Sequence, residues 1–171
     1  QLGDSRRTER LVQMATRMAD HVGQSLNAAC DGQEAAIEGG YRFIRNPRIS
    51  IEAMTEPAFQ ITAERVREGS VPILAIEDTT MLSFAHGVAK ELGDTGGKPS
   101  SSRGGLLVHT VLAVEAESSR VLGLLDQTRW TRSRTRQPRG AHKKKPYAQK
   151  ESFKWQRASE RMAQRLGEEA R

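Results

Sequence analysis

The hydrophobic pattern of this 171-residue chain changes from helical to strand spacing at Val71. Before this point, apolar residues recur every three or four positions, which is typical of amphipathic helices. After it, short apolar runs alternate with stretches rich in Gly, Ser and Pro, which is typical of strands and turns. The sequence therefore predicts an α+β chain with a helical domain over residues 1–70 and a second domain over residues 71–171.

Four helices are expected in the first domain. The first is capped at residues 4–5 and ends at Gly23, a common helix terminator. The second covers residues 31–46 and ends before a proline, because the residue preceding proline is pushed out of helical geometry. Ser50 opens a short third helix, and Pro57 opens a fourth because proline suits the first helical turn.

Three strands and one helix are expected in the second domain. The strands cover residues 72–78, 106–115 and 120–128, and the helix covers residues 152–166. A tight Ser118-Ser119 turn joins the last two strands, so they should form an antiparallel hairpin. Two polar segments lack apolar periodicity and are interpreted as loops: a flexible one at residues 94–105 and a basic one at residues 129–150.

The positive charge of the chain is concentrated near its end. Lys and Arg exceed Asp and Glu by 6 overall, and by 10 within residues 129–171. Residues 1–70 and residues 71–128 are each slightly acidic. Such a segment indicates a partner with dense negative charge, most often nucleic acid. No apolar run is long enough to span a membrane, and the single cysteine cannot form an internal disulfide. These features predict a cytoplasmic protein.

An acid pair, Glu77 and Asp78, stands at the end of the first predicted strand. A carboxylate fixed at the end of a buried strand is a rigid ligand for a divalent metal such as Mg²⁺, which supports phosphoryl transfer. The alternative is that acids followed by a turn only keep the strand end soluble. Taken alone, the pair favours this second interpretation.

Several sequence blocks stand in a characteristic order and spacing. Residues 38–47 read Glu-Gly-Gly-Tyr-Arg-Phe-Ile-Arg-Asn-Pro, and residues 74–80 read Leu-Ala-Ile-Glu-Asp-Thr-Thr. Further blocks lie at residues 2–12, 89–93, 108–109, 121–125 and 150–155. Together they resemble the cut-and-paste DDE transposases of bacterial insertion sequences, most closely the transposase of the composite transposon that carries kanamycin resistance.

This resemblance implies an amino-terminal domain that binds terminal inverted repeats of double-stranded DNA. It also implies a ribonuclease-H-like domain that cleaves and joins DNA with two Mg²⁺ or Mn²⁺ ions. Asp78 matches the first acid of the family's catalytic triad. Glu77 should then face the other way, as a structural or solvated residue, because side chains alternate along a strand.

The resemblance also implies that the other two catalytic acids lie beyond Arg171, together with a fourth strand beside the first. Without that strand, the first strand is an unpaired sheet edge. The intact protein is then expected to be a metal-dependent DDE transposase of the bacterial cytoplasm, associated with the nucleoid when bound to DNA. It would act as a DNA-bridged homodimer, and this segment alone would be inactive.

Matching motifs assign DNA contacts to four arginines. Arg7 and Arg10 share one face of the first helix, and Arg42 and Arg45 have the same spacing at the end of the second. The planar guanidinium group can donate two parallel hydrogen bonds to a phosphate or to a guanine edge. Without the resemblance, these side chains would be interpreted as surface arginines that balance nearby glutamates.

The basic loop contains the run Lys143-Lys144-Lys145, which can contact a DNA backbone without reading its sequence. A solvated insertion is an equally good interpretation. Trp130 and Tyr147, both within this loop, are candidates for stacking on bases or, more commonly, for anchoring the chain.

Two features depart from the family pattern. Gly104 and Gly105 precede two leucines where relatives have a pair of tryptophans, and the loop that is acidic in the close relative is basic here. His109 is expected to be a packed strand residue. The competing hypothesis is a truncated, non-catalytic DNA-binding protein that inhibits transposition. A general basic nucleic-acid-binding protein would leave the Ile-Glu-Asp-Thr-Thr block at residues 76–80 and the Tyr-Arg-Phe-Ile-Arg block at residues 41–45 unexplained.

Overall fold

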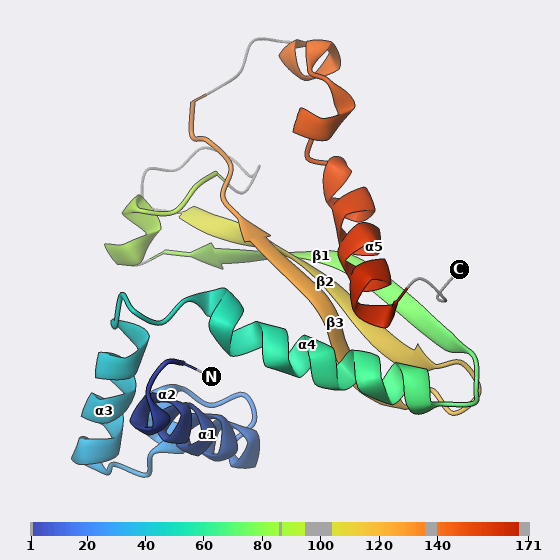
Figure 1. Cartoon of the computed structure of the whole chain (residues 1–171). Coiled ribbons are helices and arrows are strands. Elements are labelled where there is room, and N and C mark those ends of the chain that lie inside the picture. Colours follow the sequence, from blue (N-terminus) through green and yellow to red (C-terminus); the bar gives the residue numbers. More distant parts are fainter. Residues whose placement is uncertain (1, 86, 95–103, 136–139, 168–171) are drawn as a thin grey trace. The chain divides into compact units, whose positions relative to one another are not determined.

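The computed structural model describes residues 2–85, 87–94, 104–135 and 140–167 and has an α+β architecture (Figure 1). The chain divides into two units, residues 1–57 and residues 58–171. In chain order the elements are α1 (Ser5–Asp20), α2 (Leu26–Ala29), α3 (Glu34–Ile44), α4 (Ile51–Glu68), β1 (Ile73–Phe84), the 3₁₀ turn η1 (Gly87–Lys90), β2 (Gly104–Glu115), β3 (Val121–Trp130), the 3₁₀ turns η2 (Ala141–Lys144) and η3 (Tyr147–Gln149), and α5 (Phe153–Leu166).

The helix starts of the first unit follow from local backbone geometry. The Asp4 side chain caps α1 by accepting a hydrogen bond from the backbone N–H of Arg6 at 2.9 Å. Helix α3 begins at Glu34, later than expected, because Asp31 and Gly32 have φ values of 50° and 71° that no helix tolerates. The four-residue helix α2 was not expected, since so short an element shows no hydrophobic period.

A pair of glycines lets α3 approach the other helices of the first unit closely. A Cβ atom on Gly39 would lie 2.9 Å from the guanidinium carbon of Arg10, and one on Gly40 would lie 2.9 Å from Cδ2 of Leu26. Both distances are shorter than van der Waals contact, so a side chain at either position would displace the Arg10 guanidinium group or the Leu26 side chain. The buried apolar side chains of this unit are those of Leu2, Ala29, Cys30 and Phe43.

Helix α4 is one continuous element, and the expectation of separate helices on either side of Pro57 was wrong. Ser50 caps it, because the Ser50 hydroxyl accepts a hydrogen bond from the backbone N–H of Ala53 at 3.0 Å. Proline inside the helix removes one backbone hydrogen bond. The helix nevertheless continues, because its second half buries Phe59 and Ala63. The division between the two units falls inside this helix, whereas the sequence places a boundary near its end at residue 70.

The sheet has the order β1-β2-β3 with antiparallel pairing throughout, and the expected β2–β3 hairpin is confirmed. Strand β1 runs six residues past Asp78 to Phe84, so the acid pair lies in the middle of the strand and not at its end. The expected break after Asp78 is wrong because residues 79–84 keep pairing with the start of β2. No described strand pairs with the outer edge of β1. Most of the expected loop at residues 94–105 lies outside the described residues.

The core of the second unit lies between the sheet and the helices that cover one of its faces (Figure 1). Two irregularities in the β2–β3 pairing interrupt the alternation of side chains, and both Leu122 and Leu125 are buried although they are three residues apart. Helix α4 approaches β3 closely at Gly123, where a Cβ atom would lie 2.3 Å from the hydroxyl oxygen of Thr62. The core cluster consists of Ala63, Val111, Ala113, Leu122, Leu125 and Ala158.

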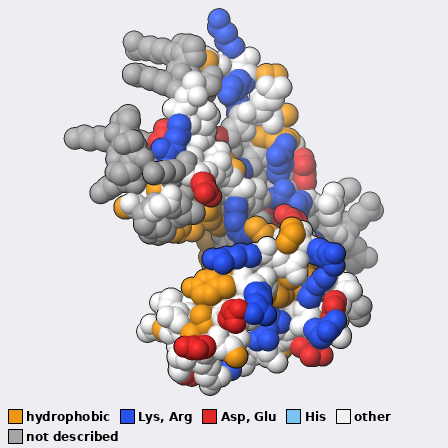
Figure 2. All heavy atoms as spheres, turned by 90° about the vertical axis from the view of Figure 1, so that its left-hand side faces the viewer, with side chains coloured by type: hydrophobic (Ala, Val, Ile, Leu, Met, Phe, Trp, Pro, Cys, Tyr) orange, Lys and Arg blue, Asp and Glu red, His pale blue; other side chains and the backbone are white. Residues whose placement is uncertain are grey.

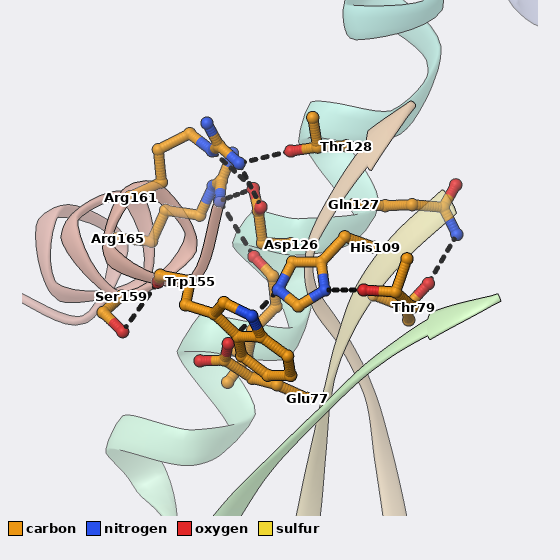
Figure 3. Close-up of polar contacts among 12 residues, drawn as sticks. Glu77, Thr79, His109, Asp126, Gln127, Thr128, Trp155, Ser159, Arg161 and Arg165 are labelled. Atoms are coloured by element: carbon orange, nitrogen blue, oxygen red, sulfur yellow. Dashed lines mark hydrogen bonds and ion pairs between the residues drawn. The ribbon is translucent and has the colours of Figure 1, made fainter. Parts of the chain in front are cut away.

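A buried carboxylate fastens α5 to β3 (Figure 3). Asp126, which is 2% exposed, accepts two hydrogen bonds from Arg161, at 2.9 and 2.5 Å, and one from Arg165 at 2.9 Å. Burial acts to raise the pKa of Asp126, but the hydrogen bonds from the two arginines outweigh it and hold the pKa below its usual value. Their stabilisation is therefore fully present above the unfolded-state pKa of about 3.9, and it is lost as the pH falls through the lower folded-state pKa.

Asp126→Asn is expected to lower the free energy of unfolding of the second unit by about 3 kcal/mol at pH 7, because two guanidinium groups would lose their buried counter-charge. Urea unfolding followed by tryptophan fluorescence measures this, since both tryptophans, Trp130 and Trp155, lie in that unit. Glu115→Gln is the control, because it removes an ion pair with the exposed Arg120 side chain at the hairpin turn. Equal effects of the two substitutions would contradict a structural role for Asp126.

Gly123→Ala is expected to destabilise the second unit by about 2 kcal/mol, because φ is +147° there and the new methyl group would collide with Thr62. The same urea titration measures it. Gly87→Ala is the matched control, because no atom lies within 4 Å of a Cβ atom built at Gly87. If Gly123→Ala were as mild as this control, α4 would not approach β3 as closely as described.

Candidate nucleic-acid interface

The two arginines expected to bind DNA from α1 are both partly buried. Arg7 donates a hydrogen bond from Nη1 to the backbone carbonyl of Leu2 at 3.1 Å, so it also holds the start of the chain. The guanidinium group of Arg10 lies against the backbone of α3 at Gly39. Because Gly39 precedes Arg42 by three residues, Arg10 and Arg42 are placed on the same side of α3.

The two arginines expected to bind DNA from the end of α3 are exposed. Arg42 forms an ion pair with Glu38 one turn earlier, and its side chain is 75% exposed. Arg45 lies over the ring of Tyr41, with 5.6 Å between its guanidinium carbon and the ring centroid. Tyr41 is itself 43% exposed. Each guanidinium group is thus held by one neighbour while most of its surface stays open.

Arg17 belongs to the same neighbourhood but was not picked out by sequence reasoning. It lies seven residues after Arg10, which is two turns along one face of α1. Its Nη2 donates to Oε1 of Gln33 at 2.9 Å, so it joins α1 to the residue that precedes α3. The seven-residue spacing was the signal that could have identified it.

The acid pair of β1 is divided between the two faces of the sheet. Asp78 pairs with Thr110 of β2 in register, and its side chain is exposed on the face opposite to the core. Glu77 faces the core side, where its carboxylate lies 3.2 Å from Nε2 of His109 and its side chain is only 15% exposed. This is the alternation expected of neighbouring strand residues.

Metal-ligating side chains do not gather around Asp78. No three His, Cys, Asp or Glu side chains lie close enough to hold a metal ion anywhere in the part of the chain that the structure describes. Glu77 is excluded as a second ligand because it points to the other face. Two-metal catalysis needs several fixed carboxylates. The described residues therefore provide one candidate ligand and do not form a complete magnesium site.

His109 is fully buried and joins β1, β2 and α5 (Figure 3). Its Nε2–H donates to Glu77, and its Nδ1 lies 3.0 Å from the hydroxyl oxygen of Thr79. The ring of Trp155 meets the imidazole edge-on, with 4.6 Å between centroids. Every polar atom of the imidazole thus has a partner, which fits the expectation of a packed strand residue.

Basic and aromatic side chains alternate around η3 and the start of α5. The ammonium group of Lys154 lies 5.4 Å from the centroid of the Trp130 ring and 5.5 Å from that of Trp155. The ring of Tyr147 contacts that of Phe153 edge-on at 5.3 Å. Sequence reasoning identified the basic composition of this region, but the contacts between rings and cations depend on how the chain folds back.

The lysine run 143–145 is exposed, whereas the acid nearest to it in the sequence is already paired. Glu151 accepts hydrogen bonds from Nε and Nη2 of Arg132 at 2.7 and 2.5 Å. These bonds hold the pKa of Glu151 below its usual value although partial burial acts against them. Figure 1 draws η2 and η3 at the top of the molecule. Figure 2, which is turned about the vertical axis, shows Lys and Arg side chains at the same height. The lysines therefore present positive charge that no described acid neutralises through an ion pair.

Two glycines occupy the start of β2. A Cβ atom on Gly104 would lie 2.2 Å from the backbone carbonyl oxygen of Ala89. Gly105 exchanges backbone hydrogen bonds with Gly93, at 3.1 and 3.0 Å. Backbone segments approach so closely that position 104 accepts only glycine.

In the described part of the chain, every helix is too short or too polar to cross a bilayer. The comparison with known protein families concerns the first unit, where α1, α2 and α3 place the four candidate arginines. Residues 1–49 match the family model of transposase DNA-binding domains, so the amino-terminal helices are similar to a domain of this kind.

Proposed function

We propose that this chain is the amino-terminal part of a cut-and-paste DDE transposase, and that its first unit recognises terminal inverted repeats of double-stranded DNA. The match of residues 1–49 to transposase DNA-binding domains carries this proposal. The described residues of that segment include all four candidate arginines, so the proposed recognition groups lie inside the matched region.

The positions of these arginines support the proposal physically. Arg10 and Arg42 share one side of α3, and the guanidinium group of Arg42 is largely exposed. A guanidinium held by a neighbour loses less conformational freedom when it binds a phosphate or a base edge. Arg7 and Arg45 would extend the contact at the start of α1 and the end of α3. Lys143, Lys144 and Lys145 are proposed to contact the DNA backbone.

The second unit is proposed to be the first part of a ribonuclease-H-like catalytic domain. Three antiparallel strands followed by a helix support this, as does an exposed aspartate on the first strand. Asp78 would be the first acid for Mg²⁺ or Mn²⁺, which would supply Lewis-acid stabilisation at the scissile phosphate. The other ligands would have to come from outside the described residues, and a DNA-bridged homodimer is the proposed active assembly.

A second candidate function is a non-catalytic DNA-binding protein that occupies transposon ends and inhibits transposition. It rests on the match of residues 1–49 alone and needs no catalytic acid. Both functions require the same DNA recognition by the first unit. They differ in whether the protein cleaves DNA.

The wild-type chain is expected to enrich a defined sequence from a pool of randomised duplexes. Arg10→Lys should then lower the preference for the enriched duplex over a scrambled one about tenfold or more, because lysine keeps the charge but loses the planar fork. Fluorescence anisotropy on both duplexes measures the ratio. Arg120→Lys, in the hairpin of the second unit, is the matched control.

Two results would contradict this part of the proposal. One is that the wild-type chain enriches no sequence. The other is that Arg10→Lys weakens binding to both duplexes equally, which would make Arg10 a backbone contact only. Circular dichroism of the variant shows whether its helical content has been kept.

Asp78→Asn is expected to leave both the urea midpoint and DNA binding unchanged, because the side chain is exposed and bonds no described residue. In protein that cleaves transposon-end DNA with Mg²⁺, the same substitution should abolish cleavage, since an amide is a poor metal ligand. Gel assays of cleaved ends measure this. Glu77→Gln is the matched control for cleavage, and retained cleavage by Asp78→Asn would remove Asp78 from the site.

A further inference from the structure

We infer that η2, η3 and the first turns of α5 form a second DNA-contact surface, which holds the phosphate backbone of duplex DNA without reading its sequence. The inference takes its ligand from the proposed function, but it concerns a different unit from the matched domain. The surface is defined by six cationic side chains: Lys143, Lys144, Lys145, Lys150, Lys154 and Arg157.

The charge of this surface is not cancelled within its own segment. Glu151 is the only acid among residues 140–157, and its carboxylate is bonded to Arg132. Lys143, Lys144 and Lys145 are exposed and form no ion pair with any described acid. Such a group of cations attracts a polyanion, and it gains free energy from the counterions that the polyanion releases.

Two of the cations are held in place by aromatic rings. Lys154 lies over the rings of both Trp130 and Trp155, and Arg157 lies over the ring of Phe153 at 5.2 Å. Cation–π contacts of this kind restrict the side chain while leaving its charge intact. Binding a phosphate then costs less conformational entropy than it would for a free surface lysine.

The ion pairs between α5 and Asp126 hold the cations of the first turns of α5 in a fixed position. Further along the helix, Arg161 and Arg165 bind the buried carboxylate of Asp126 in β3. The cationic first turns and the anchored later turns belong to one helix, so the sheet positions Lys154 and Arg157. Two cations held on one anchored helix can meet a phosphate backbone with little further loss of conformational freedom.

Duplex DNA fits this surface better than a single strand does. Single-strand binding needs open aromatic faces on which successive bases stack. The rings of Trp130 and Trp155 are both engaged by Lys154, and Trp155 also contacts His109. The exposed rings of this surface are those of Tyr147 and Trp155, at 51% and 42% exposure. Because Lys154 already lies over the Trp155 ring, the described residues offer no series of open rings for successive bases. The groups offered to a ligand are therefore ammonium and guanidinium groups.

The test uses the full chain and a 30-base-pair duplex of random sequence, with binding measured by anisotropy between 50 and 200 mM salt. The triple variant K143Q/K144Q/K145Q should reduce the slope of log K against log salt by about 2 to 3, since each phosphate contact contributes about 0.9. At 100 mM salt, affinity for this duplex should fall about tenfold or more. The charge-preserving variant K143R/K144R/K145R is the matched control and should retain the wild-type slope.

An unchanged slope in the glutamine variant would overturn the inference. So would a loss confined to a single strand of the same sequence, which would assign the lysines to single-stranded DNA. Failure of the proposed function would give a different result. The wild-type chain would enrich no sequence from the randomised pool, regardless of how the lysine substitutions change binding to random DNA. If the inference is right, the glutamine variant keeps its preference for the enriched sequence while its affinity for random DNA falls.

Discussion

The second unit depends on one buried carboxylate shared by two arginines. Asp126 lies on β3 at 2% exposure, and Arg161 and Arg165 reach it from successive turns of α5. A carboxylate at that depth is costly to bury unless its charge is matched and its oxygens accept hydrogen bonds. The charge is matched and the oxygens are hydrogen-bonded only when α5 lies across β3 at the position where both arginines reach Asp126. These ion pairs therefore fix the position of α5 more specifically than apolar packing alone would.

Other contacts of the second unit follow from that position. Arg165 also lies over the ring of Phe59 at 4.9 Å, which links α5 to the second half of α4. Trp155, near the other end of α5, closes over His109 and so covers the hydrogen bonds of Glu77 and Thr79 (Figure 3). Both helices thus lie on the core face of the sheet, and Asp78 remains exposed on the other face.

Sequence patterns predicted most elements but misjudged where they stop. Apolar spacing and cap residues located α1, α3 and α5 to within a few residues, and the turn at Ser118-Ser119 located the hairpin. The end of β1 was missed because Thr79 and Thr80 suit a strand as well as a turn. Pro57 was interpreted as a helix start because local propensity does not register the packing of the following turns on the sheet. Position 104 needs glycine for a contact with Ala89, which is remote in the sequence.

The candidate site was predictable where it depends on local geometry. Strand alternation placed Asp78 and Glu77 on opposite faces, and helix spacing grouped the arginines. Partners could not be predicted, because they come from distant segments. The imidazole of His109 meets Glu77 across 32 positions, and Arg132 reaches Glu151 across 19. These pairings decide which charges remain available for a ligand, so charge counting alone could not define the basic surface.

The burial of Cys30 has a practical consequence. It is the only cysteine of the chain, it lies in the first unit, and it is 1% exposed. A buried thiol reacts with a thiol reagent only when its surroundings open, so its rate of labelling reports the opening of that unit. Cys30 itself is the labelling site, so no cysteine has to be introduced by mutation. Labelling of this single thiol on the free chain and on the DNA-bound chain would measure how much the ligand stabilises the helices that hold it.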